Sequence, residues 1–360
     1  MKEENGWQDQ IDQTQEQSAK ADPQTGSLLF QRLPQEMRDY VYALVFSSTR
    51  LMSDYINTMM PSSEPNGLAL LRACRRAKLE IGNSWLLYVL FCFRRGEDML
   101  DKLSALPADT LSKIRHMRIN GAPIHFRRPI GHEPRRDRFD YDYFEYRLAS
   151  VFKLLPGLQL DQLTVVDGND ETDCYRSLNS FIEEGNGWKA LRYITHNSKV
   201  LGFKVSSTFG PWRRPQPMHW QMVMESRDGA ASNPLVTVYR AQQPTQVPRA
   251  GYGWILDPNM RVKFEQKSRE GQDLRPDVLP EDSELMTGDE QWKAMLVIVE
   301  RGSGADYEQK KGSPPAPLDK SDMRRDFRGM TWEQIKDTCE ISKECIGRIC
   351  FYSNSRESDL

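Results

Sequence analysis

The segment LLFQRLPQEMRDYVYALVF, from Leu28 to Phe46, opens the part of the chain that the sequence predicts to be folded. Pro34 stands where a helix is expected to begin, because a missing N–H is harmless in the first turn of a helix. Apolar residues then recur at the three- and four-residue spacing of one helix face: Met37, Val41, Leu44 and Val45. The pattern predicts one short amphipathic helix.

A second segment, LALLRACRRAKLEIGNSWLLYVLF from Leu68 to Phe91, follows after a polar gap. Its apolar residues also fall at helical intervals: Leu68, Leu71, Cys74, Ala77, Ile81, Trp85 and Tyr88. Its basic residues fall mainly on the opposite side: Arg72, Arg75, Arg76 and Lys78. We therefore expect a second amphipathic helix within a helical segment over 28–95, with the apolar stripes of the two helices buried against each other.

The composition predicts a globular protein without a membrane or nucleic-acid partner. The chain has 360 residues, 38% of them hydrophobic, and its 49 basic and 51 acidic residues give a net charge of −2. Such a balance provides no general field for a phosphate polyanion. Residues 1–27 are polar and are expected to form a disordered tail, and the longest apolar run, Trp85 to Phe93, is far below the about 20 residues of a membrane helix. We expect a soluble protein in the cytoplasm or nucleus, with its cysteines reduced.

Residues 96–205 read as helices that alternate with strands. Predicted helices cover Asp98–Ala105, Tyr141–Leu155 and Cys174–Glu184, and predicted strands follow at Ile114–Ile119, Leu160–Val166 and Leu191–Thr195. This alternation favours parallel strands joined by right-handed crossovers. Because the spacings are unequal, the region is predicted to be irregular and only similar to leucine-rich repeats.

Residues 206–352 are predicted to form a C-terminal α+β region. A helix is expected from Pro217 to Gly229, and Thr331 with Gln334 forms a capping box for a last helix. A disordered insertion is expected over 301–325, and residues 353–360 are expected to form a tail. Strands are expected at Leu235–Ala241, Arg261–Glu265 and Met295–Glu300. The fold class is therefore α/β or α+β, with a helical pair, irregular helix–strand units and a C-terminal mixed sheet.

No catalytic motif is present in the sequence. It contains no G-x-S-x-G elbow, H-E-x-x-H helix, C-x-x-C pair or phosphate-binding G-x-x-x-x-G-K-[ST] loop. The acidic cluster Asp167–Asp173 resembles a calcium loop only superficially, because Thr172 stands where glycine is needed and Leu178 where a bidentate glutamate is needed. We expect a solvated loop there, and we predict no catalytic residue, metal or cofactor.

A block rich in proline and glycine contains tryptophan and arginine residues suited to recognition. These two residue types are enriched at binding hot spots of protein interfaces. We predict an exposed recognition surface made by Trp212, Arg213, Arg214, Trp220 and Trp254.

Two motifs carry a resemblance to a known family. The first is L-P-x-E at Leu33, Pro34 and Glu36; the second, L-L-x-x-C-R-x-x-x-x-E, runs from Leu70 to Glu80. Together they resemble the N-terminal signature of a group of filamentous-fungal proteins with an F-box-like segment. Later blocks, W-x-x-x-x-x-x-R-D-G from Trp220 and M-T-W-E-x-I from Met330, also look like segments of that family.

An F-box docks on the Skp1 adaptor of a ubiquitin ligase and leaves the rest of the chain to select a substrate. The resemblance therefore implies a non-enzymatic substrate receptor. It implies adaptor contacts at Leu33, Pro34, Glu36, Val41 and Leu44. Two alternatives stay open: a stand-alone scaffold that keeps these helices only as core, and an enzyme without a recognisable motif.

Overall fold

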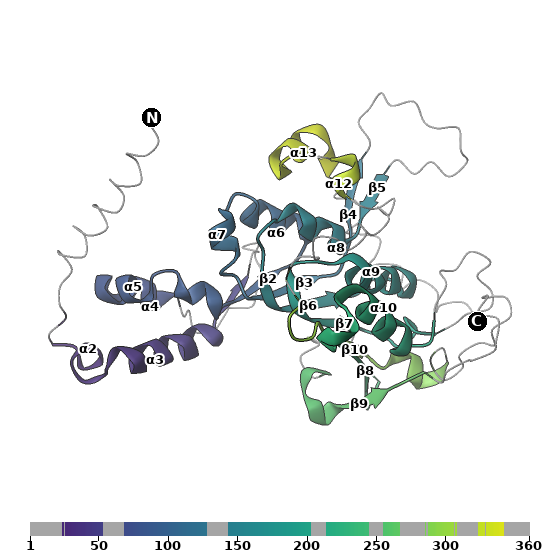
Figure 1. The fold of residues 1–360 in the computed structure, drawn as a ribbon, viewed down its shortest axis with the longest axis horizontal. Coiled ribbons are helices and arrows are strands. Elements are labelled where there is room, and N and C mark those ends of the chain that lie inside the picture. Colours follow the sequence, from purple (N-terminus) through teal and green to yellow (C-terminus); the bar gives the residue numbers. More distant parts are fainter. Residues whose placement is uncertain are drawn as a thin grey trace, which may run out of the picture. The chain divides into compact units, whose positions relative to one another are not determined.

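The computed structural model describes residues 24, 26–52, 68–127, 143–202, 214–244, 255–266, 285, 287–305, 307, 323–327 and 329–341 (Figure 1). The chain divides into two compact units. Unit 1 comprises Met1–Cys92 and Lys113–His116, and unit 2 comprises Phe93–Ser112 and Met117–Leu360. Both contain helices and strands, so the predicted mixed α/β class is confirmed. Nearly all of the predicted N-terminal tail, and all of the C-terminal one, lie outside the described residues.

Unit 1 consists of short helices and a pair of strands. Strand β1 (Arg50–Met52) pairs in parallel with β2 (Leu90–Phe93), with Arg50 opposite Leu90. Neither strand was predicted. The helical elements are α2 (Leu28–Arg32), α3 (Gln35–Ser47), α4 (Ala69–Ala73), α5 (Arg75–Ile81) and the 3₁₀ helix η1 (Ser84–Leu87).

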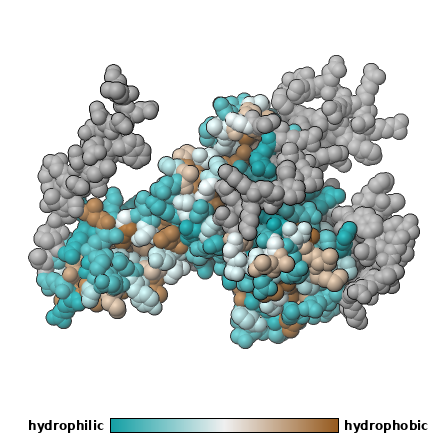
Figure 2. Space-filling model, viewed as in Figure 1, coloured by the Kyte–Doolittle hydropathy of each residue, from teal (hydrophilic) through white to brown (hydrophobic). Residues whose placement is uncertain are grey.

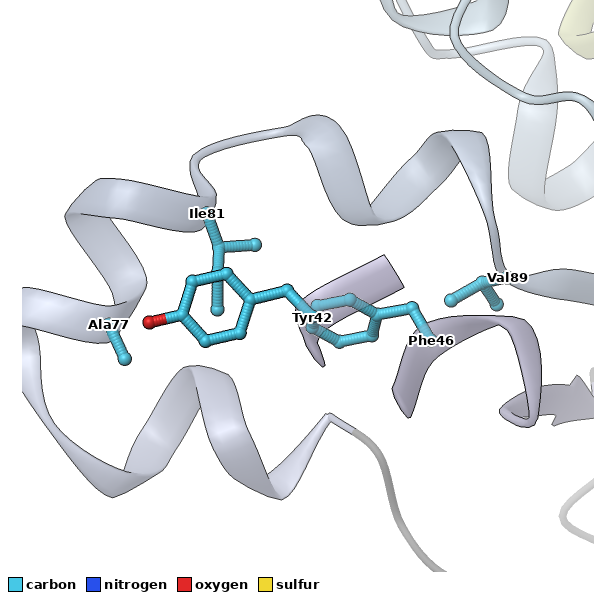
Figure 3. Close-up of a cluster of buried hydrophobic side chains, with 5 residues drawn as sticks. All are labelled: Tyr42, Phe46, Ala77, Ile81 and Val89. Carbon is cyan, nitrogen blue, oxygen red and sulfur yellow. The ribbon is translucent and has the colours of Figure 1, made fainter. Parts of the chain in front are cut away.

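The face of α3 that packs on the rest of unit 1 differs from the predicted one. Its buried residues are Arg38, Tyr42 and Phe46, whereas the predicted stripe leaves Met37 51% and Leu44 54% exposed. The rings of Tyr42 and Phe46 thereby enter the core in place of the aliphatic side chains of the predicted stripe, and large rings bury more apolar area. Figure 3 shows where this core lies: between α3, α5 and the segment before β2, with side chains from Tyr42, Phe46, Ala77, Ile81 and Val89.

The second predicted helix is interrupted at Cys74. That residue has extended backbone angles, φ −154° and ψ 154°, and its sulfur accepts a hydrogen bond from the Ala77 N–H at 3.3 Å, which caps α5. At the other end Gly82 has a φ of 51°, a left-handed conformation that glycine adopts without strain. The apolar run that follows forms a 3₁₀ turn and strand β2 instead of a continued helix.

Unit 2 is built on a mixed sheet. Strands β6 and β7 are parallel, with Leu160 opposite Trp188, and β10 is antiparallel to both β7 and β8. The strand order is β3 (His116–Asn120), β6 (Leu160–Asp167), β7 (Trp188–Thr195), β10 (Met295–Glu300), β8 (Leu235–Ala241) and β9 (Arg261–Phe264). Each of these strands overlaps a predicted one, and the bounds of β8 and β10 are as predicted.

Helices alternate with the strands of unit 2, as predicted. Helix α9 (Glu171–Glu184) lies between α8 (Leu148–Val151) and α10 (Met218–Asp228) and packs against both (Figure 1). It begins three residues before the predicted start because the Asp170 carboxylate accepts from the N–H groups of Thr172 and Asp173 at 2.8 and 3.0 Å. The remaining helices are α6 (Gly96–Leu103), α7 (Ala108–Leu111), α12 (Met323–Asp326), α13 (Trp332–Thr338) and the 3₁₀ turns η2 (Phe152–Leu154), η3 (Ala230–Ser232), η5 (Pro258–Met260) and η6 (Gly288–Trp292). The Thr331 capping box of α13 is confirmed.

The predicted helix Tyr141–Leu155 is wrong in its first half. Its residues Tyr143–Tyr146 form β5, which pairs with β4 (Ile124–Arg127) in a small antiparallel sheet completed by β11 (Glu340–Ile341). The burial of Tyr146 explains why this segment is a strand, because its ring packs against the rings of Phe126 and Phe327, which are distant in sequence. The centroid of the neighbouring Phe126 ring lies 5.6 Å from the ring centroids of Tyr146 and Phe327 and 6.2 Å from that of Trp332.

The predicted disordered insertion over 301–325 is wrong at both ends. Arg301 is buried and donates to the Asp228 carboxylate at 2.6 and 2.8 Å. The next residue, Gly302, packs directly against the backbone of Ser232: a Cβ added to Gly302 would be 1.6 Å from the Ser232 carbonyl oxygen. Helix α12 begins at Met323. Residues 308–322 lie outside the described part of the chain.

Candidate functional site

Helix α3 presents an apolar stripe on the side that faces away from α5. Met37 is 51%, Tyr40 62% and Leu44 54% exposed, and Leu33 and Val41 beside them are half-buried. Met37, Tyr40 and Leu44 follow one another at three- and four-residue intervals and so share one face of α3. Val41 lies four residues after Met37 and three before Leu44, and Leu33 directly precedes the start of the helix. These five residues are here called the α3 stripe. Isolated exposed apolar residues are ordinary, but a contiguous row on one helix marks a candidate interaction site.

The opposite side of α3 is held by a charged network. The Arg38 guanidinium donates to both carboxylate oxygens of Glu80 in α5, at 3.0 and 2.9 Å, and to the Leu33 carbonyl at 2.6 Å. Glu80 also accepts from the Tyr42 hydroxyl at 3.1 Å and from Arg76 Nε at 3.1 Å. A bidentate arginine–carboxylate pair fixes orientation as well as distance, so α3 is held in one rotational position.

The pKa values in this network favour its charged form. Burial alone would raise the pKa of Glu80, but hydrogen bonds from Arg38, Arg76 and Tyr42 outweigh burial and lower it. Burial and the neighbouring Glu80 charge raise the pKa of Tyr42 to about 12. The hydrogen bond to Glu80 raises the pKa of Arg38. Carboxylate, guanidinium and neutral phenol therefore persist together around neutral pH.

The residues predicted to contact an adaptor all lie on or beside α3. Pro34 is the N-cap and Glu36 lies in the first turn, where a carboxylate is favoured by the helix dipole; both are exposed. Leu33 and Val41 are half-buried and Leu44 is exposed. The five predicted residues are therefore all at least partly accessible, on α3 or directly before it. Met37 and Tyr40, which the motif did not single out, are also exposed on this helix.

Trp220 is not part of an exposed recognition surface, so that prediction is wrong. Its side chain is fully buried, with its ring centroid 5.7 Å from that of Tyr175, and its indole N–H donates to Asn179 at 3.2 Å. It lies on the side of α10 that packs against α9, where large rings are most effectively buried. Of the other predicted residues, Arg214 is exposed. Trp212, Arg213 and Trp254 lie outside the described residues.

The R-D-G part of the W-x-x-x-x-x-x-R-D-G block has a structural role. Arg227 donates to the carbonyls of Phe181 and Ile182 at 3.2 and 2.9 Å and to that of Gly185, so a cation terminates α9. Burial lowers the pKa of Arg227 to about 10, which leaves it charged. Asp228 pairs with Arg301, as described above. Sequence reasoning missed Arg227 and Arg301 because nothing local marks an arginine that will be buried.

The acidic segment Asp167–Asp173 is more buried than predicted. Asp167 is fully buried; it accepts from the Tyr193 hydroxyl and from the Asn169 N–H, the latter at 3.0 Å. Burial raises the pKa of Asp167 and that of the adjacent Cys174 thiol. Within the described residues no group of His, Cys, Asp and Glu side chains could hold a metal ion. The Asp167 cluster is a hydrogen-bonded network in which protein groups satisfy one another.

Comparison of the chain with family models, with curated proteins and with solved structures gave no match. Among the described helices, none combines the length and the apolar character needed to cross a membrane. The candidate site is therefore defined by its own geometry: an apolar stripe on a helix whose other face is fixed by Arg38 and Glu80.

Proposed function

We propose that the chain is a non-enzymatic interaction protein that docks a protein partner on the α3 stripe. The observation that supports this most is the combined exposure of Met37, Tyr40 and Leu44 on one face of a helix held in position from behind. Helices that offer anchors at such intervals are a recurrent means of protein recognition. A preorganised helix also loses little conformational entropy on binding.

The apolar area still exposed on the stripe is sufficient for specific binding. Complete burial of a Leu or Met side chain contributes about 1.5–3 kcal/mol, and about half of each side chain remains to be covered. Met37, Tyr40 and Leu44 together therefore offer about 3 kcal/mol, which corresponds to about a hundredfold in affinity. This is a central contribution, to which contacts around the stripe would add.

The partner that we propose is a Skp1-type adaptor of a ubiquitin ligase, with the chain as substrate receptor. The L-P-x-E start at Leu33, Pro34 and Glu36 supports this choice, because it resembles the start of an F-box. On this proposal Leu33, Val41 and Leu44 contact the adaptor, while unit 2 is available for a substrate.

The test compares two double variants of the full chain. Met37→Asp with Leu44→Asp places charges on the stripe, and Met218→Asp with Met222→Asp places them on α10, where the side chains are 48% and 61% exposed. Binding to a purified Skp1-type adaptor is measured by titration calorimetry. We expect the stripe variant to lose about a hundredfold or more in affinity and the α10 variant to bind as the parent chain does.

Adaptor binding that survives the stripe variant, or that is absent from the parent chain, would refute the proposal. Thermal melting of both variants distinguishes the adaptor proposal from the alternative that the chain is a stand-alone scaffold. If the stripe served only as core, its charged variant would lose cooperative melting, because an unpaired buried charge costs several kcal/mol. The exposure of Met37 and Leu44 predicts that cooperative melting is kept.

A further inference from the structure

Arg192, near the middle of β7, has a guanidinium group without a partner. The side chain is half-buried, and in the part of the chain that the structure describes it makes no hydrogen bond and no ion pair. Neighbouring residues of a strand point to opposite faces of the sheet. The next residue, Tyr193, faces α9, because its hydroxyl donates to the Cys174 carbonyl at 3.1 Å. Arg192 therefore lies on the face of the sheet turned away from α9.

Arg261 of β9 lies over the same face and has a donor without an acceptor. Its guanidinium lies over the Tyr239 ring, 4.4 Å from the ring centroid. One terminal nitrogen donates to the carbonyls of Ile255 and Leu256 at 3.2 and 3.4 Å. The Nε atom of Arg261 is buried and has no hydrogen-bond partner. A buried donor that no protein group satisfies is costly, which makes this Nε a candidate point of ligand contact.

The register of the sheet brings the two arginines close to each other. Arg192 lies opposite Ile298 of β10, which lies opposite Thr237 of β8. Tyr239, whose ring lies under Arg261, is the next residue of β8 on the same face. Strands β7 and β8 are two ladder spacings apart, about 10 Å, so two arginine side chains can reach one group placed between them. Burial, and after it the charge of Arg261, lowers the pKa of Arg192.

The carboxylates on this face do not pair with either arginine. Among the described strand residues they are Glu300 and Glu265, and both are exposed. The charge of Glu300 acts on Arg192, but the two form no ion pair, and Glu265 is bound by Lys263 at 2.8 Å. Figure 2 shows hydrophilic and hydrophobic side chains side by side around β9. Two like charges without a bound anion repel each other, so an anion placed between them would stabilise both.

We propose that Arg192 and Arg261 together bind a phosphate group, either free or as the monoester of a small molecule. A phosphate group carries about two negative charges at neutral pH and has three strong acceptor oxygens, which suit two guanidinium groups with unused donors. A carboxylate carries one charge and would leave one arginine without its anion. The hydroxyl of Thr164, opposite Arg192 in β6, is a further donor on this face. The proposal does not depend on the function assigned to the α3 stripe.

Nucleic acid is a poorer candidate for this site. Tight binding to a nucleic-acid backbone uses about 6–10 cationic contacts, whereas one pair of arginines offers far fewer.

The test is an NMR titration of the phosphate resonance with the full chain, at constant ionic strength. Inorganic phosphate and methyl phosphate are the two ligands, so the titration distinguishes a site for the free ion from one that also admits an ester. Arg192→Gln removes one guanidinium, and Arg192→Lys keeps its charge but not its fork of donors. The matched control, Arg176→Gln, makes the same change at an exposed arginine of α9, which covers the other face of the sheet.

We expect saturable binding of inorganic phosphate to the parent chain, about tenfold weaker binding to Arg192→Gln, an intermediate loss for Arg192→Lys and no change for Arg176→Gln. Phosphate should also raise the Tm of the parent chain more than that of Arg192→Gln. Without phosphate, Arg192→Gln should melt at or above the parent Tm, because it removes a half-buried cation and its repulsion with Arg261. The Met37→Asp, Leu44→Asp variant should bind phosphate as the parent chain does, which separates this proposal from the adaptor proposal.

Four outcomes would overturn it. The parent chain fails to bind inorganic phosphate saturably, or Arg192→Gln binds it as tightly as the parent chain does. In the third, Arg176→Gln weakens binding as much as Arg192→Gln, which would reduce the effect to net charge. In the fourth, Arg192→Gln lowers Tm without phosphate, which would make Arg192 a structural residue.

Discussion

Replacing Glu80 by glutamine tests whether the Arg38–Glu80 pair fixes α3. The carboxylate accepts from Arg38 at 2.9 and 3.0 Å, from Tyr42 at 3.1 Å and from Arg76 at 3.1 Å. Glutamine keeps the size of the side chain but turns an N–H₂ group toward these donors. Arg38, 6% exposed, would then be a buried cation without its anion.

The expected loss follows from the exposure of the pair. Breaking a buried ion pair costs about 3–5 kcal/mol. The Glu80 side chain is 15% exposed and Arg38 keeps the Leu33 carbonyl, so we expect the lower end, about 3 kcal/mol of unfolding free energy. For a unit of this length that is a fall of about 12–24 °C in Tm. Glu333→Gln, at a side chain 69% exposed, should cost about 0.5 kcal/mol or less.

Differential scanning calorimetry of the two variants at neutral pH measures these shifts. The pH dependence gives a second readout. The folded-state pKa of Glu80 is lowered, so its stabilising contribution is present above the unfolded pKa and is lost as pH falls through the folded value. The difference between the parent chain and Glu80→Gln should therefore shrink in acid. A Glu80→Gln Tm equal to that of Glu333→Gln would refute the argument.

Three further predictions concern unit 2. Arg227→Ala leaves buried carbonyls at the end of α9 without their donor and should destabilise the protein by about 3 kcal/mol in urea unfolding, with m unchanged. Gly302→Ala forces the backbone away from Ser232 and should cost about 1–3 kcal/mol or more by the same measurement, whereas Gly168→Ala, in open space, should be close to neutral. Burial, with the charge of Asp170, raises the pKa of Asp173 to about 7, so its charge disfavours folding as pH rises through that value. Asp173→Asn should raise Tm at pH 8 and leave Tm unchanged below the pKa that Asp173 has in the unfolded chain. A variant that raises Tm in acid but not at pH 8 would contradict the expected direction of the pH dependence.

The elements predicted most accurately from the sequence are those determined by neighbouring residues. Strand β8 contains three consecutive β-branched residues, α10 begins after Pro217 and ends before Gly229, and Thr331 caps α13 with Gln334. In each case the signal and the structure lie within a few residues of each other. Local steric and hydrogen-bonding preferences are then sufficient, because nothing distant competes with them.

Elements that depend on distant residues were predicted poorly. Strand β5 exists because Tyr146 meets Phe126, Phe327 and the Asp326 carboxylate, which accepts from its hydroxyl at 2.9 Å. No pattern around residue 146 encodes a partner 180 positions away. The burial of Trp220 is similar, since its neighbours Tyr175 and Asn179 come from another helix. Tertiary contacts overrode local propensity at both places.

The orientation of α3 depends both on a local pattern of residues and on a residue distant in sequence, and it determines which side chains form the proposed site. Two faces of this helix carry apolar residues, one with Met37 and Leu44 and the other with Tyr42 and Phe46. A hydrophobicity pattern favours the first face, because the second contains Arg38, which counts as polar. Glu80 reverses that choice by supplying the anion that makes a buried arginine tolerable. Once Arg38 turns inward, Met37 and Leu44 must turn outward, so the same ion pair that builds unit 1 also creates the α3 stripe.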